Sequence, residues 1–270
     1  MIEKKNGIPC VTFSLFEKAG GIAAAVAGRQ GGVSAAPFDT LNMSFSTGDD
    51  PAAVRENRRR FLTALGMPPE DIVSCHQVHG THIEVVGRAD RGQGALDAES
   101  ALPACDGLAA DEAGVPLTMN FADCTPLLFY DPIHHAAGVA HGGWRGAAGD
   151  IGGKTVRLME ERFRTRPEDL LCGIGPAIGG CSFEVGRDVI DAFAPLFDGE
   201  TLAGLVKEKG GGKFLFDLPG ANRRLLLRAG VAEEHIEMCG LCTYCRDDLF
   251  FSYRKSGGIT GRHMAAVMLK

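Results

Sequence analysis

The chain has 270 residues, 45% of them hydrophobic and 23% charged, with a formal net charge of −6. This length suffices for one large domain or two small ones, and the composition is that of a soluble globular protein. The small acidic excess gives no electrostatic basis for binding nucleic acid or an anionic membrane. Residues 1–9 lack the apolar stretch of a secretory signal, and no apolar run reaches the length of a membrane span. We therefore expect a cytoplasmic location.

Hydrophobic patterning predicts short strands interspersed with helices. Asp50 as N-cap and Pro51 at the first position begin a helix whose apolar stripe ends at Gly66. In chain order we predict a strand at 22–27, this helix, strands at 72–78, 82–86, 117–122, 126–130 and 136–140, a helix at 147–163, a strand at 170–174, helices at 187–197 and 218–229, and a strand at 264–269. Because strands and helices do not alternate regularly, the order favours a mixed α+β layered fold over a doubly wound parallel sheet.

Three potential metal ligands follow predicted strands. His79 closes one strand, Cys124 lies in the turn between two others, and His141 follows a fourth. Two imidazoles and one thiolate match the preference of Zn²⁺, and three protein ligands leave a fourth position for water or substrate. The alternative is that Cys124 is a buried core thiol and His141 a hydrogen-bonded residue at a strand end.

A glycine-rich segment, residues 142–149, leads from His141 into the next predicted helix. Such a turn presents backbone N–H groups and the positive end of the helix dipole to an oxyanion or phosphate. Arg145 would add a bidentate clamp, and Trp144, the single tryptophan, would offer a stacking surface. Alternatively, the glycines only permit a tight turn and Trp144 belongs to the core.

The nine cysteines are odd in number, which favours reduced thiols over a disulfide framework. Cys239, Cys242 and Cys245 are spaced like part of an iron–sulfur or zinc-ribbon ligand set, but no fourth ligand lies nearby. We interpret them as reduced thiols around a turn. Asp106 is either a carboxylate that orders a loop or a site residue. Arg58 belongs to the solvent face of its helix or reaches an anionic ligand.

Three motifs together are specific: His-Gln-Val-His-Gly at 76–80, Ala-Asp-Cys-x-Pro at 122–126 and Ala-His-Gly-Gly-Trp-Arg-Gly at 140–146. They resemble the YfiH-like family, also called the polyphenol oxidase laccase-domain, peptidoglycan editing factor or purine nucleoside phosphorylase family. The resemblance continues through Phe-Ser-Tyr-Arg at 251–254 and covers nearly the whole chain. It implies one α+β domain, residues 1–270, with mixed β-sheets layered between helices, and the metal ligands His79, Cys124 and His141. Phe121, Gly142 and Ala27-Gly28 depart from the family pattern without removing a ligand.

The resemblance implies a zinc-dependent enzyme that phosphorolyses adenosine, inosine and methylthioadenosine and deaminates adenosine. For deamination, a zinc-activated water would attack purine C6. Asp123 would shuttle the proton or orient a ligand. We expect small-molecule partners, a purine nucleoside and phosphate, and a monomer or weak homodimer. The candidate catalytic residues are Cys124, His141, Asp123 and Arg145, and the candidate substrate-binding residues are Arg29, Asn42, Arg58 and Gln77, with Arg29, Arg58 and Arg145 unranked as phosphate holders.

Three alternatives remain open. His₂Cys ligation can hold copper, with Met119 as an axial ligand, in a polyphenol oxidoreductase; the eight histidines, however, include no His-x-His pair. Cys124 as nucleophile and His141 as base would make an amide hydrolase acting on a peptidoglycan precursor. A structural zinc protein that binds a nucleoside-like ligand would need a fourth ligand, for which the candidates are Cys75, His76 and Cys105.

Overall fold

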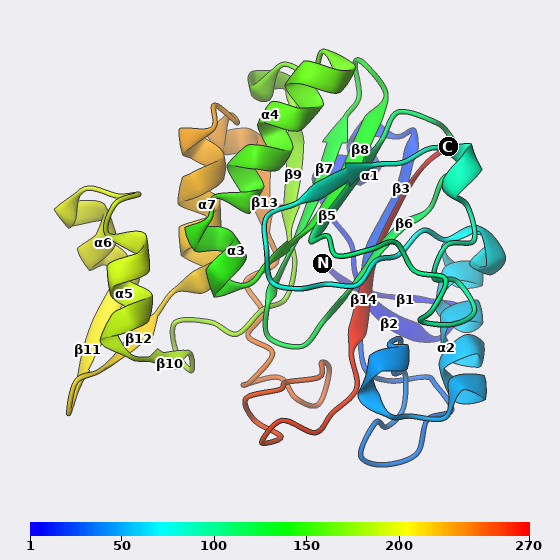
Figure 1. Ribbon diagram of the computed structural model, residues 1–270, viewed down its shortest axis with the longest axis horizontal. Coiled ribbons are helices and arrows are strands. Elements are labelled where there is room, and N and C mark those ends of the chain that lie inside the picture. The colour runs from blue at the N-terminus through cyan, green and yellow to red at the C-terminus, as the bar shows by residue number, and fades with distance from the viewer.

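Two β-sheets pack face to face in the computed structural model, which describes residues 1–270 (Figure 1). The first sheet is antiparallel throughout and has the order β1 (Ile2–Lys5), β2 (Ile8–Val11), β3 (Ile22–Ala27), β14 (His263–Leu269) and β6 (Leu117–Phe121). The second sheet is mixed and has the order β13 (Ile236–Met238), β9 (Leu171–Ile174), β7 (Thr125–Asp131), β8 (Ala136–Gly142), β5 (Gly107–Ala110) and β4 (Ile83–Val85). A small third sheet has the order β10 (Glu184–Val185), β12 (Lys213–Phe216) and β11 (Val206–Gly210).

Seven α-helices accompany the sheets. They are α1 (Ser14–Ala19), α2 (Pro51–Ala64), α3 (Trp144–Ala148), α4 (Ile151–Phe163), α5 (Arg187–Phe193), α6 (Gly199–Leu205) and α7 (Leu218–Arg228). None of them is both long enough and apolar enough to cross a membrane. In Figure 1, α5, α6, β11 and β12 project to one side of the two main sheets, as a lobe attached through α7 and β10.

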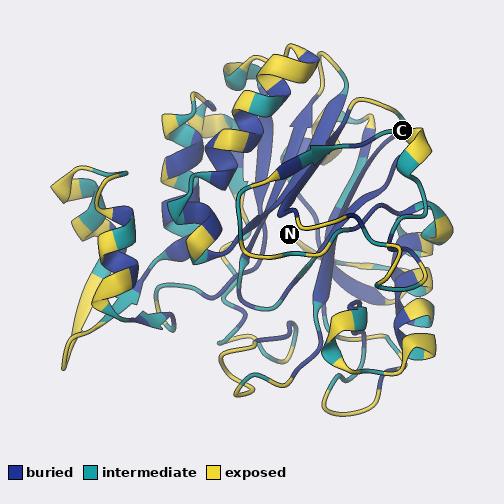
Figure 2. Ribbon diagram, in the orientation of Figure 1, coloured by how far each residue is buried: buried dark blue, intermediate teal, exposed yellow.

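Side-chain burial explains the layering, because the central strands β7, β8 and β14 are buried along their whole length and so on both faces (Figure 2). Between the sheets, Met119 and Val267 of the first meet Leu128 and Val139 of the second. On its outer face the first sheet packs against α2, and the second packs against α4 and α7. The order helix, sheet, sheet, helix confirms the α+β prediction of mixed sheets layered between helices. Removing this much apolar surface from water is the main source of stability.

Most predicted strands are confirmed to within two residues, but 72–78 is not a strand. That segment makes isolated bridges from Val73 to Leu117 and from Cys75 to Leu102. The backbone N–H of Ser74 donates to Gln93 O and that of His76 to Leu102 O, so loops rather than a ladder satisfy this backbone. The apolar residues Ile72 and Val73 are buried, but only Val73 pairs with a strand, through the single bridge to Leu117 of β6.

Two predicted helices have different limits in the structure. Residues 147–163 divide into α3 and α4, because Asp150 adopts a left-handed conformation with φ of 61° that interrupts the helix. The helix predicted at 187–197 ends at Phe193. Pro195 lies two residues further on and has no backbone N–H to continue the helical hydrogen bonds.

One connection positions the candidate site. Strands β6 and β7 follow each other in the chain but belong to different sheets, so residues 122–124 cross from one sheet to the other. Strand β8 is the antiparallel neighbour of β7 and pairs Pro126 with His141. The crossing therefore brings Cys124 to the end of β8 that carries His141.

Candidate metal centre

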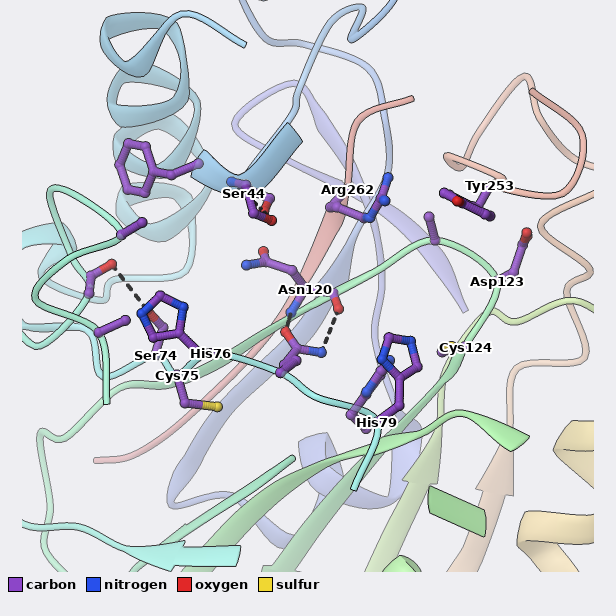
Figure 3. Close-up of a pocket in the computed structure, with 18 of the residues that line it drawn as sticks. Ser44, Ser74, Cys75, His76, His79, Asn120, Asp123, Cys124, Tyr253 and Arg262 are labelled. Carbon is purple, nitrogen blue, oxygen red and sulfur yellow. Dashed lines mark hydrogen bonds between the residues drawn. The ribbon is translucent and has the colours of Figure 1, made fainter. Parts of the chain in front are cut away.

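Three side chains from separate elements converge at this crossing. His79 comes from the loop before β4, Cys124 from the turn between β6 and β7, and His141 from β8. Their candidate ligand atoms all lie within 4.8 Å of one another, and the two imidazole rings meet at 71° with centroids 4.8 Å apart. His79 is exposed, Cys124 half-buried and His141 buried. Figure 3 shows His79 and Cys124 together on the wall of a pocket. This set can hold one metal ion with an open position.

Unusual backbone conformations shape the turns that carry these ligands. His79 has φ of 60° and Asp123 has φ of 84°, in the region that non-glycine residues rarely adopt. Such conformations are retained where the surrounding structure fixes them, often at functional sites. Gly143 contributes by lacking a side chain, since a Cβ there would lie 2.9 Å from Cys124 Sγ. The backbone is thus arranged to let the cysteine approach the two histidines.

Asp106 organises two of the three ligands. Its fully buried carboxylate accepts the Nδ1–H of His141 at 2.9 Å and the backbone N–H groups of His79 at 3.0 Å and Gly80 at 2.6 Å. Protonated Nδ1 leaves Nε2 of His141 as the nitrogen available to a metal. Burial alone would raise the pKa of Asp106, but the bonds from His141 and Gly80 lower it below its usual value. Asp106 thus orders the loop at His79 and Gly80 and also contacts His141, so the two interpretations from the sequence are compatible.

The charges of Cys124 and His141 depend on each other. Burial would raise the pKa of the Cys124 thiol, but His141 and His79 outweigh it and lower this pKa to about 6. Burial would lower the pKa of His141, but the Cys124 thiolate and Asp106 raise it to about 9. The site therefore favours a thiolate at neutral pH, which is the protonation state in which cysteine binds metal or acts as a nucleophile.

The ligands open onto a cavity of about 560 Å³. That volume falls within the usual range for small-molecule sites. Asn120 exchanges two hydrogen bonds with Gln77, which fixes this amide against β6. The lining is made of residues from both main sheets, from α2, α3 and α7, and from the loops around them: Ser44, Phe45, Ser46, Arg58, Ser74, Cys75, His76, Gln77, His79, Gly94, Asp97, Ala98, Ala101, Asn120, Ala122, Asp123, Cys124, His141, Trp144, Ile178, Phe183, Leu218, Tyr253, Arg254 and Arg262.

Arg58 and Gln77, two of the predicted substrate-binding residues, line the cavity. Buried Arg58 is not on a solvent face: its guanidinium donates to the carbonyls of Met43, Gly94 and Ala95 and lies 4.3 Å from the Phe45 ring centroid. Burial lowers the pKa of Arg58 to about 9. Three hydrogen bonds to neutral carbonyls leave its charge without a carboxylate partner, which suits an anionic ligand.

Three other candidates lie outside the lining. Arg29 donates to Asp39 O and Asp247 O and lies over the Phe251 ring, so it ties loops together. Asn42 is fully buried and bonds Asp49 and the backbone N–H of Arg262. Exposed Arg145 lies over the Trp144 ring at 4.2 Å and does not line the cavity itself. The structure therefore does not bring these three to the cavity.

The structure adds Arg254 and Arg262 to the lining. Nη1 of Arg262 donates to Thr260 O and Gly261 O, and its other two guanidinium nitrogens remain available to a ligand. Figure 3 shows Arg262 and Tyr253 beside Asp123 and Cys124 at the pocket. The Phe-Ser-Tyr-Arg motif contained a signal for Arg254, but no local pattern marks Arg262.

The remaining ligand candidates do not complete the metal set. Cys75 and His76 line the cavity but do not join the three clustered ligands, and the Cys75 thiol donates to Cys105 O at 3.1 Å. Met119 packs in the core between the sheets, outside the lining, because its strand turns it away from the cavity. The site is thus a three-ligand site facing a cavity rather than a closed four-ligand site.

Comparison with known proteins identifies the relatives of this chain. Residues 23–270 match the family model described as "Multi-copper polyphenol oxidoreductase laccase". The chain is 45% identical over 248 residues to "Purine nucleoside phosphorylase YlmD" of Geobacillus stearothermophilus, covering 91% of this chain and 90% of that protein. It is 35% identical over 250 residues to "Purine nucleoside phosphorylase YfiH" of Escherichia coli, covering 92% and 94%. The crystal structure of the Geobacillus protein superposes with a TM-score of 0.93 at 40% identity, covering 99% and 98% of the two chains.

Proposed function

The chain belongs to the family described as multi-copper polyphenol oxidoreductase laccase, and we propose that within it the protein acts as a zinc-dependent purine nucleoside phosphorylase that also deaminates adenosine. The observation that carries the proposal is the His79, Cys124 and His141 set in the wall of a cavity of about 560 Å³. Relatives named purine nucleoside phosphorylases support the first activity. The proposed substrates are adenosine, inosine and methylthioadenosine, and the proposed location is the cytoplasm.

Zinc fits the donor set better than copper does. Two imidazoles and one thiolate with an open fourth position are typical of catalytic zinc, and the buried Asp106 bond to His141 is the usual support for a histidine ligand. A zinc ion held there would supply Lewis acidity and an activated water for attack at purine C6. A copper oxidoreductase is less well supported, because Met119 lies away from the cavity.

Phosphorolysis requires phosphate beside the ribose C1′, where a C–O bond forms as the bond to the purine nitrogen breaks. Among the arginines that line the cavity, Arg262 is the first candidate to hold phosphate, because two of its guanidinium nitrogens make no hydrogen bond within the protein and it lies beside Cys124 at the pocket (Figure 3). Arg58 is the second candidate. A guanidinium holds phosphate through paired hydrogen bonds, which fixes its orientation toward the sugar.

We propose a positioning role for Asp123. One of its carboxylate oxygens accepts the Thr243 hydroxyl at 2.6 Å and the other accepts the backbone N–H of Arg254 at 2.7 Å. Each oxygen thus already has a donor, which supports orienting Cys124 over shuttling a proton. Cys124, His141 and His79 would hold the metal. Gln77, whose amide is bonded to the backbone of Asn120 in β6, would contact the nucleoside.

Metal content paired with product analysis tests the proposal. We expect zinc to be bound at His79, Cys124 and His141, and adenine to be released from adenosine only when phosphate is present. Cys124→Ala should abolish both. Arg262→Gln should raise KM for phosphate at least tenfold and change KM for adenosine less, whereas Arg145→Gln should leave both unchanged. Zinc-replete protein without nucleoside turnover contradicts the proposal, and a selective phosphate defect in Arg145→Gln contradicts the ranking of the arginines.

A second candidate is the amide hydrolase. The mutual pKa shifts of Cys124 and His141 favour a thiolate beside an imidazolium when no metal is bound, which is the state of a cysteine nucleophile with its base. Zinc would occupy that thiolate and suppress its attack. The hydrolase is therefore supported if metal-free protein cleaves a peptidoglycan-type amide and zinc inhibits it, and it is excluded if zinc is required for every activity.

A further inference from the structure

A second cluster of potential ligands lies outside the cavity lining. Cys181 precedes β10, and Cys242 and Cys245 lie in the turns after β13. Their sulfur atoms all lie within 4.8 Å of one another. Cys181 takes the place that the sequence spacing gave to Cys239, which packs instead against the core between the sheets. The interpretation as reduced thiols around a turn holds for Cys242 and Cys245, and a distant segment supplies the third sulfur.

The sulfur separations match a shared ion better than a covalent bond. Cys181 Sγ and Cys245 Sγ lie 3.6 Å apart. Zinc–sulfur bonds of about 2.3 Å in a tetrahedral arrangement place neighbouring sulfurs about 3.8 Å apart, whereas a disulfide needs about 2.05 Å. Three sulfurs this close enclose room for one ion, and iron–sulfur clusters are usually held by four cysteines.

Backbone hydrogen bonds hold the two segments in place without any metal. The N–H of Ala177 donates to Leu241 O, and the N–H of Thr243 donates to Ala177 O at 3.0 Å. The N–H of Gly179 donates to Cys242 Sγ at 3.3 Å. A hydrogen bond to sulfur stabilises a thiolate and orients it as a ligand. Cys242-x-x-Cys245 has the ligand spacing of structural zinc sites.

We propose that Cys181, Cys242 and Cys245 form a second zinc site, in which three thiolates bind Zn²⁺ and the fourth position is open to solvent. Each thiol releases its proton to solvent when the ion binds. Cys181 and Cys245 are exposed, which gives the ion a direct entry path. This inference does not depend on the proposed enzymatic activity, since none of the three cysteines lines the cavity.

The second zinc would link two segments that contact the pocket, one through its own lining residues and the other through a hydrogen bond to Asp123. The segment with Cys181 also carries Ile178 and Phe183, both of which line the cavity. The segment with Cys242 carries Thr243, which donates to Asp123. A metal link between these segments would limit their relative movement and so support the turn at Cys124.

Metal binding in a Cys124→Ala background tests the inference, because this change removes the pocket site. The protein is kept reduced, stripped by chelator, confirmed as folded by circular dichroism, and titrated with Co²⁺ alone or with Zn²⁺ alone. We expect one equivalent of Zn²⁺ to bind, and Co²⁺ to give the thiolate charge-transfer absorption of a cysteine site. Adding Cys181→Ser or Cys245→Ser should abolish both signals, whereas the matched control Cys239→Ser should retain them.

Stoichiometric binding that depends on Cys181 and Cys245 supports the site. Absence of cobalt absorption in folded Cys124→Ala overturns it, as does binding that survives in Cys124→Ala/Cys181→Ser. Recovery of a Cys181–Cys245 disulfide from oxidised protein, with no metal bound by the reduced form, also overturns it. Purified wild-type protein should contain two equivalents of zinc, falling to one in either Cys124→Ala or Cys181→Ser.

Discussion

The two ligand clusters contain the same number of side chains and differ in what surrounds them. The pocket triad, His79, Cys124 and His141, lines the cavity, and the buried Asp106 carboxylate accepts a hydrogen bond from His141. The cysteine cluster, Cys181, Cys242 and Cys245, lies outside the cavity, and two of its members are exposed. A ligand set that faces a cavity with arginines can act on a substrate, whereas one between two surface segments can only hold them together. The proposed roles, chemistry for the triad and structural support for the cluster, rest on these surroundings.

Removing one cysteine from each set should give the largest contrast. Cys124→Ala should reduce phosphate-dependent adenine release by more than about 10³-fold, because a catalytic metal contributes several kcal/mol to transition-state stabilisation. Cys181→Ser should retain activity within about twofold of the wild type at low temperature, since Cys181 does not line the cavity. Initial rates on metal-analysed protein check both. A loss of activity in Cys181→Ser as large as that in Cys124→Ala would contradict the different roles proposed for the two clusters.

Asp106→Asn tests the carboxylate behind the triad. The amide cannot match the negative charge that holds His141 and the N–H groups of His79 and Gly80. We expect zinc affinity and activity to fall about 10- to 100-fold, as for other groups that support a metal ligand. Competition with a fluorescent chelator measures the affinity.

A matched control lies at the other end of β7. Asp131 is equally buried and holds His134 Nδ1 at 2.9 Å and the backbone N–H groups of Ile133 and His134. Asp131→Asn should lower thermal stability but leave zinc affinity unchanged. Equal losses of affinity in the two variants would show that the effect of Asp106 is a general loss of stability.

A chelator should remove zinc from the two clusters at different rates. The cysteine cluster has two exposed ligands, Cys181 and Cys245, whereas the triad has one, His79, and its His141 is only 3% exposed. A chelator should therefore remove one equivalent of zinc in a fast phase with little loss of activity, and a second equivalent in a slow phase together with the activity. Stopped-flow chelator absorbance and parallel assays report the two phases. Activity lost in the fast phase would reverse the assigned roles.

Among the variants expected to lose activity, Thr243→Val should lose the least, because it removes one hydrogen bond between the two regions. The Thr243 hydroxyl donates to the Asp123 carboxylate at 2.6 Å, and Thr243 is fully buried. Loss of a bond to a charged group costs about 1.5–3 kcal/mol in unfolding free energy, and we expect activity to fall severalfold. Thr155→Val removes a buried bond to Ile151 O within α4 and should leave activity unchanged. Urea unfolding and initial rates compare the two variants.

The sequence allowed most strands of the two main sheets to be predicted, because short apolar runs mark buried strands whatever their neighbours, but β5 and β13 were missed. The β1–β2 hairpin was missed although Asn6-Gly7 between its strands is a strong turn signal. The three triad residues were predicted to lie together, and the structure brings them together. The role of Asp106 could not be predicted, since nothing local shows that its carboxylate accepts the consecutive N–H groups of Val78, His79 and Gly80.

Arginines were the least predictable part of the site. Arg29, Arg58 and Arg145 all lie near motifs, yet only Arg58 reaches the cavity lining. Which way a long side chain points depends on partners that are distant in sequence, such as Asp247 for Arg29. Arg262 was missed for the same reason, because its place at the cavity follows from the pairing of β14 with β6. The partner of Cys242 and Cys245, Cys181, likewise follows from tertiary structure alone.

The crossing of the chain between the sheets, at residues 122–124, also has a consequence for folding. Cys242 and Cys245 are neighbours in sequence and can capture an ion before the domain is complete. The triad cannot, because Cys124 meets His79 and His141 only after the two sheets have docked. Contacts between distant segments form late, since their loop-closure entropy must be overcome first. Metal capture by the triad should therefore mark the last cooperative step of folding, and a nascent or partly folded chain would have no assembled catalytic centre.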